Sequence, residues 1–455
     1  MELANAMLRQ IGGIKDVIYD EGALYLYRKA HGLWGPVTDD DASRIIQSFA
    51  GIPTQGAYRV APLRVNASDI TGTVKVAHDQ ARKPRFFAEA PVGLSFSNGF
   101  VEVSAQGIKL KPLSRDNLAR SGYNCPYDPK AKSLVFLAFL HSIFRDDSDR
   151  VEKIAFLQEL FGASLIQAAT RYQKCALLIG DGENGKDTLI DVLQSVFPPG
   201  TVSAVAPHKW SHDYTRARLA GIWLNVIGEL PESDLDASEA FKSIVVGGEI
   251  DARYPYGRVF NFRPVAGHVF AANANMGTPD FSHGFFRRFG VIRFNRTFTA
   301  AERDVTIKDR LIATEMPAII TWLVEGAQRL MARGAYALPA SHHTELAAWR
   351  LSADQVAMFL ENRTRPLAAG ESGTLADFLY QEFSSWAEEN GHKRMTSTKF
   401  GVRAKLILKE RGLPEPARNK RGMVYPITTR KGEGVAFGLG QTRIAKKGSN
   451  IISLR

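Results

Sequence analysis

Apolar residues first run together and then recur at helical spacing around residues 174–197. Cys175 to Ile179 is a continuous apolar run, which is typical of a strand buried on both faces. From Thr188 to Phe197, apolar residues return every three or four positions, which predicts a helix. A glycine-rich stretch separates the two patterns, so the predicted local order is strand, loop and helix.

Residues 1–170 show two further patterns. Residues 1–115 carry two hairpin signals, at the Asp20-Glu21-Gly22 turn and the Asn98-Gly99 turn, and a short helix over 39–49. They predict an N-terminal α+β module. Residues 116–170 predict two amphipathic helices, over 133–144 and 149–165, that form a helical collar against the domain that follows.

Residues 171–330 alternate apolar strands with helical stretches and predict an α/β domain. Residues 331–370 predict a connector with one helix over 341–363. Residues 371–442 read as a helix, a second helix over 397–411 and a strand over 423–428, which is the plan of a winged helix. Residues 443–455 remain as a basic tail.

Composition narrows the classes of protein. A chain of 455 residues with 45% hydrophobic and 23% charged residues is typical of a soluble protein with two to four domains. It has no apolar run of membrane-spanning length and no secretory signal, so we expect a cytoplasmic protein in a bacterial host and no membrane partner. Two cysteines exclude a disulfide framework and do not suggest zinc.

The net charge of +11 is unevenly distributed. Residues 393–455 hold 16 Lys and Arg against three acidic residues, a net of +13, which leaves a net of −2 for residues 1–392. A solubilising tail is one interpretation. The helix, helix and strand order within this segment favours a module that binds a polyanion.

The glycine-rich loop fits the P-loop spacing, from Gly180 to Gly185 and Lys186. Its glycines can adopt positive φ and turn backbone N–H groups toward phosphate oxygens, and Lys186 would reach the β- and γ-phosphates of ATP. Asp187 stands where the pattern has Ser or Thr, so Mg²⁺ would be held by Asp187 or Thr188. The alternative is a turn that binds nothing. The predicted nucleotide site comprises Gly180, Asp181, Gly182, Glu183, Asn184, Gly185, Lys186, Asp187 and Thr188.

Three later positions complete the predicted chemistry. Glu229 ends an apolar strand that runs from Leu219 through Ile227, where an acid can hold Mg²⁺ or polarise the attacking water. Asn273 ends the next apolar strand and could orient that water or the γ-phosphate. Arg287 and Arg288, set among phenylalanines, are either a structural clamp or a finger donated to a neighbouring subunit.

Two segments predict contact with DNA. Two β runs flank Pro255-Tyr256-Gly257, so Arg253, Tyr254, Tyr256 and Arg258 lie near a hairpin tip, where rings stack on bases and cations meet phosphates; an ordinary exposed hairpin is the alternative. In the basic C-terminal module, the second helix and the wing carry the other candidates. They are Lys399, Arg403, Lys405, Lys409, Arg418, Lys420 and Arg421.

The ordered series GDGENGKDT, LAGIWLNVIGE, KSIVVGGEIDARYPYGRVFNF, VFAANAN and FFRRFGVIRF resembles the superfamily 3 helicases. It is most similar to the poxvirus and phage primase-helicase branch, over about residues 90–430. The resemblance implies a P-loop AAA+-like core and a homo-hexameric ring that hydrolyses ATP between subunits and moves on single-stranded and forked DNA. It assigns Lys186 to the phosphates, Glu229 to the Walker B role, Asn273 to the sensor and Arg288, with Arg287, to the finger in trans. Lys242 joins the hairpin residues as part of the segment that meets DNA.

The main hypothesis is an ATP-driven replicative helicase of a phage, plasmid or genomic island, working with a separate primase or initiator. The lone acid at Glu229 and the replacement at Asp187 motivate an alternative, a nucleotide-gated initiator that binds DNA and hydrolyses little. A helicase with its own primase activity is less favoured, because residues 1–115 show no Asp-x-Asp pair on a strand with a partner acid downstream.

Overall fold

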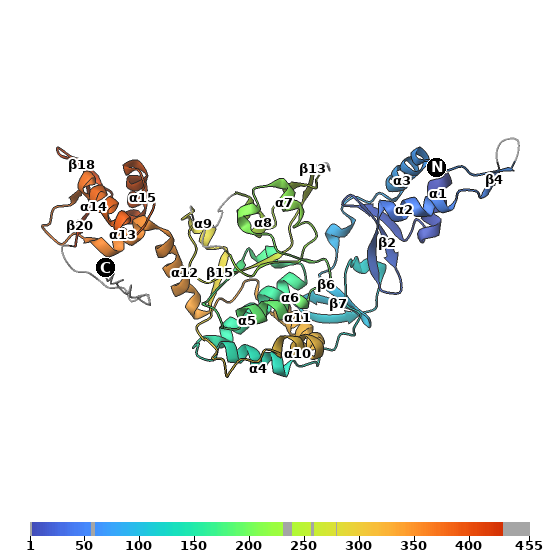
Figure 1. Cartoon of the computed structure of the whole chain (residues 1–455), viewed down its shortest axis with the longest axis horizontal. Helices are drawn as coiled ribbons and strands as arrows, with labels where there is room; N and C mark the ends of the chain where they lie inside the picture. The colour runs from blue at the N-terminus through green and yellow to red at the C-terminus, as the bar shows by residue number, and fades with distance from the viewer. Residues whose placement is uncertain (1, 56–59, 231–238, 256–258, 279, 431–455) are drawn as a thin grey trace, which may run out of the picture. The chain divides into compact units, whose positions relative to one another are not determined.

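The computed structural model describes residues 2–55, 60–230, 239–255, 259–278 and 280–430 (Figure 1). The chain divides into two compact units, Met1–Trp349 and Arg350–Arg455. Each unit has a hydrophobic core of its own.

A five-stranded parallel sheet forms the centre of the first unit. Its strands lie in the order β10-β11-β14-β9-β15, so β14 lies between β9 and β11 although it follows both in the sequence. Every residue of β9 and β14 is buried, as the continuous apolar runs predict. The bounds are β9 Cys175–Ile179, β10 Val202–Ser203, β11 Leu224–Ile227, β14 Gly267–Ala272 and β15 Phe289–Arg293.

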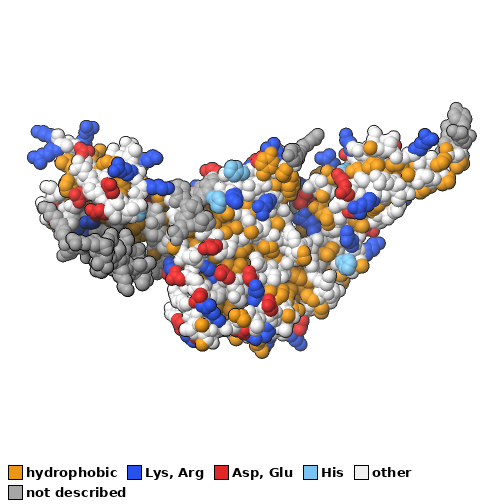
Figure 2. Space-filling view, viewed as in Figure 1, with side chains coloured by type: hydrophobic (Ala, Val, Ile, Leu, Met, Phe, Trp, Pro, Cys, Tyr) orange, Lys and Arg blue, Asp and Glu red, His pale blue; other side chains and the backbone are white. Residues whose placement is uncertain are grey.

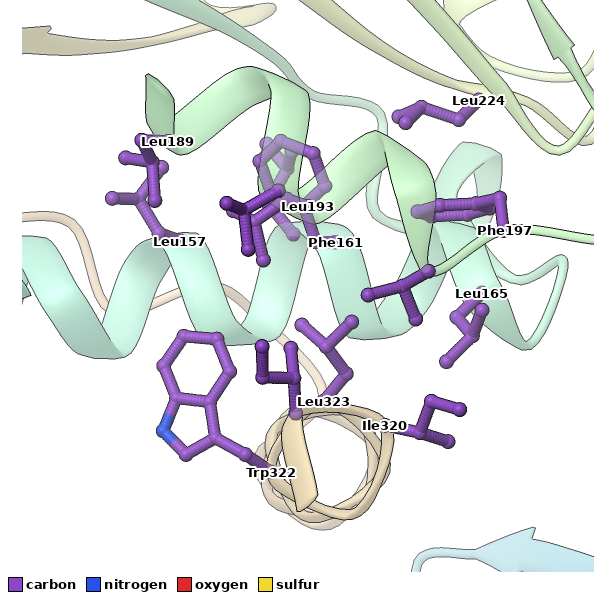
Figure 3. Packing of buried hydrophobic residues seen from close by; sticks show 14 of the residues in the cluster. Leu157, Phe161, Leu165, Leu189, Leu193, Phe197, Leu224, Ile320, Trp322 and Leu323 are labelled. Atoms are coloured by element: carbon purple, nitrogen blue, oxygen red, sulfur yellow. The ribbon is translucent and has the colours of Figure 1, made fainter. Parts of the chain in front are cut away.

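Helix α5 (Arg150–Leu165) is buried along most of its length between α6 (Lys186–Ser195) and α11 (Met316–Arg333) (Figure 3). Leu157 and Phe161 point toward the side chains of α6, and Leu323 approaches from α11. Two glycines allow the close approach of α5 and α11. A Cβ on Gly162 would overlap the backbone of Leu323, and a Cβ on Gly326 would overlap that of Gln158. The predicted collar helices are therefore core elements.

The described N-terminal part of this unit contains small antiparallel sheets and three helices, of which the sequence pattern predicts only the helix near residues 39–49. Sheets β1-β2-β3 and β6-β7-β8 carry the two predicted hairpins. The residues of β6 and β7 join the core that contains α5 and β9. The bounds are α1 Glu2–Ile11, β1 Val17–Asp20, β2 Ala23–Arg28, β3 Leu33–Val37, α2 Asp39–Ser48, β4 Pro53–Gln55, β5 Val60–Pro62, α3 Ala67–Ala81, β6 Gly93–Phe96, β7 Gly99–Ser104 and β8 Gly107–Lys111.

Shorter elements complete the first unit. They are α4 Leu134–Ile143, α7 Asp213–Ala217, α8 Glu239–Val245, β12 Ile250–Arg253, β13 Val259–Phe262, α9 His283–Phe286 and α10 Ile307–Thr314. Strands β12 and β13 pair antiparallel, which confirms the hairpin body. In the part of the chain that the structure describes, no helix is both long and apolar enough to cross a membrane.

The second unit combines three helices with short strands. Phe359, Phe383, Trp386 and Phe400 pack together in its core, and Phe359 comes from the predicted connector. Sheet β17-β19-β18 and the pair β16-β20 complete it. The bounds are α13 Gln355–Arg363, β16 Thr364–Pro366, β17 Thr374–Leu375, α14 Ala376–Glu389, α15 Ser397–Glu410, β18 Ala417–Asn419, β19 Gly422–Tyr425 and β20 Ile427–Thr429. Helix α12 (Ala340–Ala353) precedes α13.

Three predicted elements differ from the structure. The single helix over 341–363 is wrong: it is two helices, because Asp354 is extended and caps α13 through the N–H groups of Val356 and Ala357. The strand over 423–428 is divided at Pro426 into β19 and β20, since proline has no N–H to donate. The strand expected from Leu219 begins only at Leu224.

Candidate functional site

Three predicted site residues follow adjacent parallel strands. Gly180 follows β9, Asn273 follows β14 and Glu229 comes two residues after β11. Because these strands are parallel and neighbouring, their carboxyl ends meet at one edge of the sheet. The sheet topology therefore brings the glycine-rich loop, Asn273 and Glu229 together, although Gly180 and Asn273 are 93 positions apart in the sequence.

Lys186 connects these groups. Its Nζ donates hydrogen bonds to the carbonyl oxygens of Gly180 at 3.1 Å and Ala272 at 3.3 Å, and to Asn273 Oδ1 at 3.4 Å. Asn273 Nδ2 in turn donates to Glu229 Oε1 at 3.3 Å. The structure thus joins three of the predicted catalytic residues in one hydrogen-bonded chain.

The Lys186 side chain is only 5% exposed, whereas Glu229 and Asn273 are exposed. Burial lowers the pKa of Lys186, and the nearby carboxylates of Asp187 and Glu229 act in the opposite direction. A buried ammonium held only by neutral oxygen atoms is poised to exchange them for a phosphate, whose full negative charge it would pair with more strongly.

The loop between β9 and α6 is held by its own side chains and backbone. Asn184, which is buried, accepts a hydrogen bond from the Lys186 N–H through Oδ1 at 3.1 Å and donates through Nδ2 to the Asp181 carbonyl. Of the loop glycines, only Gly185 adopts positive φ, at +80°. Glu183 takes φ +65°, so the left-handed turn falls partly on a residue with a side chain.

The remaining glycine roles are steric. A Cβ on Gly180 would lie 2.9 Å from Phe294 Cβ, and one on Gly185 would lie 2.7 Å from Ile143. Gly180 is therefore required for close packing and not, as predicted, for positive φ. Gly182 has free space around it.

Sequence reasoning missed the segment after β15, which binds the loop from outside. The Phe298 N–H donates to the Glu183 carbonyl at 2.8 Å, and Arg303 forms an ion pair with the Glu183 carboxylate. Arg303 neutralises one of the loop's two acidic residues. Nothing in the sequence signals this contact, because the two residues are 120 positions apart and Arg303 resembles any exposed arginine.

The side-chain oxygen atoms near the loop can supply some, but not all, of the ligands of a hard cation. Asp187 is exposed in the first turn of α6, Thr188 is half-buried beside it, and Glu229 is exposed at the same edge. Among the described residues, no three His, Cys, Asp or Glu side chains cluster closely enough to hold a metal alone. These residues fit Mg²⁺ bound through one or two carboxylates, with phosphate oxygens and water as the other ligands.

Arg287 and Arg288 lie at the opposite end of β9. The Lys174 ammonium donates to the Arg287 carbonyl, and the Cys175 N–H donates to the Arg288 carbonyl at 2.7 Å. Since β9 has five residues, the two arginines are separated from the loop by a rise of roughly 16 Å. Within one chain, the structure does not bring them to Lys186.

The two arginine side chains have different environments. Arg287 is exposed. Arg288 is 9% exposed and donates to the Gly284 carbonyl, while its buried Nε has no hydrogen-bond partner among the described residues. Burial and the charge of Arg287 lower the pKa of Arg288. Arg288 therefore makes one contact that would suit a structural clamp, through the Gly284 carbonyl. Its Nε is a donor with no partner among the described residues.

The hairpin candidates are divided between exposed and paired positions. Tyr254 is 53% exposed and stacks on Phe260 with ring centroids 5.2 Å apart. Arg253 pairs with Asp213 at 3.2 Å, and its guanidinium lies over the Tyr214 ring. Tyr256 and Arg258 lie outside the described residues.

Lys242 has a partner already. It pairs with Asp280 at 2.8 Å and is only partly exposed. A contact between Lys242 and DNA would therefore have to replace this ion pair.

In the second unit, six of the seven basic candidates are exposed and one is not. Arg403 donates through Nε to Asp354 at 2.6 Å, and the Asp354 side chain is 2% exposed. Arg403 therefore joins α15 to the capped start of α13. The exposed candidates are Lys399, Lys405, Lys409, Arg418, Lys420 and Arg421.

Comparison with known proteins gives one family and one group of structures. Residues 178–288 match DUF5906, a family of unknown function, and this segment contains Lys186, Glu229, Asn273 and both arginines. Among solved structures, the chain is similar at 11% identity to an apo A form of the NrS-1 C-terminal region, with a TM-score of 0.45 over 76% of this chain and 74% of that one. Two apo structures of NrS-1 residues 305–718 have TM-scores of 0.44, over 93% and 94% of this chain and 98% and 99% of theirs.

Proposed function

We propose that this chain is an ATP-dependent replicative DNA helicase of a phage, plasmid or genomic island, built on a P-loop AAA+-like core of the superfamily 3 type. The observation that carries the proposal is the hydrogen-bonded chain from Lys186 through Asn273 to Glu229, at the carboxyl edge of a sheet whose sensor strand lies between the other two. A glycine-rich turn that binds nothing has no need for a buried lysine joined to an exposed acid.

Each residue has a role that its position supports. Lys186 would hold the β- and γ-phosphates of ATP, together with the N–H groups at the start of α6. Glu229 would accept a hydrogen bond from the attacking water, and Asn273 would fix the carboxylate that does so. Bound Mg²⁺ would neutralise phosphate charge, with Asp187 and Thr188 as its nearest protein oxygens.

The positions of Lys186 and Arg288 at opposite ends of the sheet support ATP hydrolysis at an interface between two subunits. Lys186 and Arg288 lie at opposite ends of β9, so an arginine finger from this chain can reach only the loop of a neighbour. A ring in which every interface joins one loop to one arginine pair has this arrangement, and a homo-hexamer is the ring that the resemblance to superfamily 3 implies.

Two surfaces support a DNA substrate. Tyr254 on the β12–β13 hairpin is exposed for stacking on single-stranded bases. The second unit combines helices α13, α14 and α15 with the β18–β19 hairpin, and it has exposed basic residues on α15 and on the hairpin. This combination supports a winged-helix domain that binds DNA.

The test is DNA-stimulated ATP hydrolysis and unwinding of a forked duplex by the full chain, with Lys186→Ala as the inactive variant. Electron microscopy with an ATP analogue and forked DNA would test the ring. If the wild-type protein remains a monomer and hydrolyses no ATP on any DNA, the proposal is wrong.

A second candidate is a nucleotide-gated initiator that assembles on DNA and hydrolyses little. Asp187 in the hydroxyl position and the single acid at Glu229 favour it. ATP-dependent ring formation with negligible turnover would distinguish it from the helicase. A separate primase or initiator remains an expected partner of the helicase.

A further inference from the structure

Helix α15 presents an exposed face of mixed chemistry. Its buried side packs Phe400, Ala404, Ile407 and Leu408 into the core of the second unit. On the outer side, Val402 is 67% exposed and Leu406 is 46% exposed. Three lysines share that side with them: Lys399, Lys405 and Lys409.

The two aliphatic residues are one helical turn apart, so they form one continuous apolar spot. The helix cannot rotate to bury them. Arg403, between them in the sequence, is tied to the buried carboxylate of Asp354, which also caps α13. The structure therefore holds Val402 and Leu406 outward.

Charge identifies the occupant of this face. From Ser397 to Lys409 the helix has no acidic residue. Elsewhere in the same unit, the β18–β19 hairpin carries Arg418, Lys420 and Arg421, all exposed. Figure 2 shows Lys and Arg side chains gathered on the C-terminal unit. A face with these cations suits a polyanion, and a polyanion that also offers apolar groups is duplex DNA, whose major groove displays thymine methyls and admits an α-helix.

We propose that α15 reads base pairs in the major groove, with Val402 and Leu406 contacting thymine 5-methyl groups while the lysines hold the flanking phosphates. This rests on the DNA-binding role in the proposed function and adds sequence preference to it. Lysine contacts to phosphates carry no sequence information, so the preference would depend on the two aliphatic side chains.

The experiment uses the full-length protein and a random duplex pool. Bound duplexes are selected, and the preferred duplex is synthesised again with deoxyuridine in place of each thymine, a change that removes only the methyl group. We expect affinity to fall about three- to fivefold at one or two positions, the effect of losing one buried methyl. Val402→Thr with Leu406→Asn should abolish this discrimination while binding to non-preferred duplexes persists.

Two comparisons complete the design. Val305→Thr changes another exposed valine, 88% accessible and in the first unit, and should leave the discrimination intact. Lys399→Ala with Lys405→Ala should weaken binding to all duplexes alike and flatten its dependence on salt.

The outcomes separate this inference from the proposed function. Wild-type protein that hydrolyses ATP and binds duplexes without distinguishing thymine from deoxyuridine overturns the inference alone. An altered oligomeric state in Val402→Thr with Leu406→Asn, with DNA discrimination unchanged, also overturns it and makes the face a protein contact. Loss of both ATP hydrolysis and DNA binding in the wild type overturns the proposed function as well.

Discussion

Asn273 Nδ2 donates a hydrogen bond to Glu229 Oε1 at 3.3 Å, and this contact joins the ends of two adjacent strands. The same amide accepts from Lys186 through its oxygen. A neutral amide can face a cation and an anion at once because it has both a donor and an acceptor. Asn273 is therefore the residue that links Lys186 to Glu229.

Replacement of Asn273 tests that position. Asn273→Ala should lower kcat for DNA-stimulated ATP hydrolysis by about a hundredfold with little change in KM, because the Glu229 carboxylate loses the donor that orients it. Asn273→Asp should be at least as inactive, since a second carboxylate would repel Glu229. Steady-state kinetics measure both. A near-normal kcat in Asn273→Ala would mean that the contact has no role in hydrolysis.

The acid at Asp187 should make hydrolysis unusually dependent on Mg²⁺. Removing the metal with a chelator should stop turnover, and Asp187→Ala should raise the Mg²⁺ concentration needed for half-maximal rate by about tenfold or more. Asp187→Ser restores the usual hydroxyl and should keep hydrolysis. Titration of Mg²⁺ at saturating ATP gives the measurement. If Asp187→Ala has the wild-type titration curve and Thr188→Val does not, Thr188 is the ligand.

The separation of Lys186 from Arg288 predicts complementation between subunits. Lys186→Ala and Arg288→Ala should each be inactive alone, with a loss of about a thousandfold for the finger. Mixing the two variants should restore measurable hydrolysis, because some interfaces then join an intact loop to an intact arginine. Arg287→Ala, at the exposed member of the pair, shows in the same assay whether hydrolysis needs both arginines or Arg288 alone.

The result also distinguishes the two interpretations of the arginine pair. If the mixture stays inactive while rings form, and Arg288→Ala melts at a lower temperature, Arg288 is a structural clamp through the Gly284 carbonyl. Mixed rings are followed by electron microscopy, and melting by circular dichroism.

The sequence predicts the site where chemistry is local and fails where contacts are distant. Buried strand runs, the loop spacing and the strand-terminal positions of Glu229 and Asn273 are all local patterns, and in the structure Lys186, Asn273 and Glu229 are joined by hydrogen bonds. The Glu183–Arg303 pair joins residues far apart in the sequence, so no local pattern reveals it.

Surface cations show the same limit. Arg403 and Lys405 look alike in the sequence, yet Arg403 pairs with a buried aspartate and Lys405 is exposed to solvent. Helical spacing places both on α15, but only the packing of α13 against α15 decides which of them is buried. The sequence pattern does not reveal the break at Asp354, because both flanking helices have the same apolar spacing.

A buried histidine predicts how stability depends on pH. His342 Nδ1 accepts a hydrogen bond from the Val291 N–H at 3.0 Å, and burial, with Lys174 and His343 nearby, lowers its pKa to about 4. The unfolded chain binds a proton near its usual pKa of about 6.5, so stability is full above that value and falls as the pH drops toward 4. At about pH 5, the loss attributable to His342 is about 2 kcal/mol.

Urea unfolding of the wild type and of His342→Gln at neutral and acidic pH measures this effect. The variant should have a shallower loss of stability between these two pH values. His343→Gln, at an exposed position, should lie much closer to the wild type, because burial, the main cause of the lowered pKa of His342, is unchanged. Equal pH dependence in wild type and His342→Gln would show that His342 is protonated in the folded protein.

The ion pair between Arg403 and Asp354 predicts a loss of stability that is separate from DNA binding. Arg403→Ala leaves the Asp354 carboxylate buried, with the α13 N–H groups as its remaining partners among the described residues, so the second unit should lose about 3 kcal/mol of unfolding free energy. Lys405→Ala, on the exposed side of the same helix, should lose less than about 0.5 kcal/mol. Chemical unfolding followed by circular dichroism measures both.

The two variants should rank in the opposite order for DNA affinity, with the larger loss in Lys405→Ala. Lys405→Ala removes an exposed cation and should weaken duplex binding, whereas Arg403→Ala, measured well below its unfolding transition, should bind nearly as the wild type. Arg403→Lys is a useful intermediate, because it keeps the charge but loses the planar guanidinium that reaches Asp354. If Arg403→Ala is as stable as the wild type and binds DNA more weakly than Lys405→Ala, the arginine contacts DNA, and the ion pair with Asp354 opens when it does.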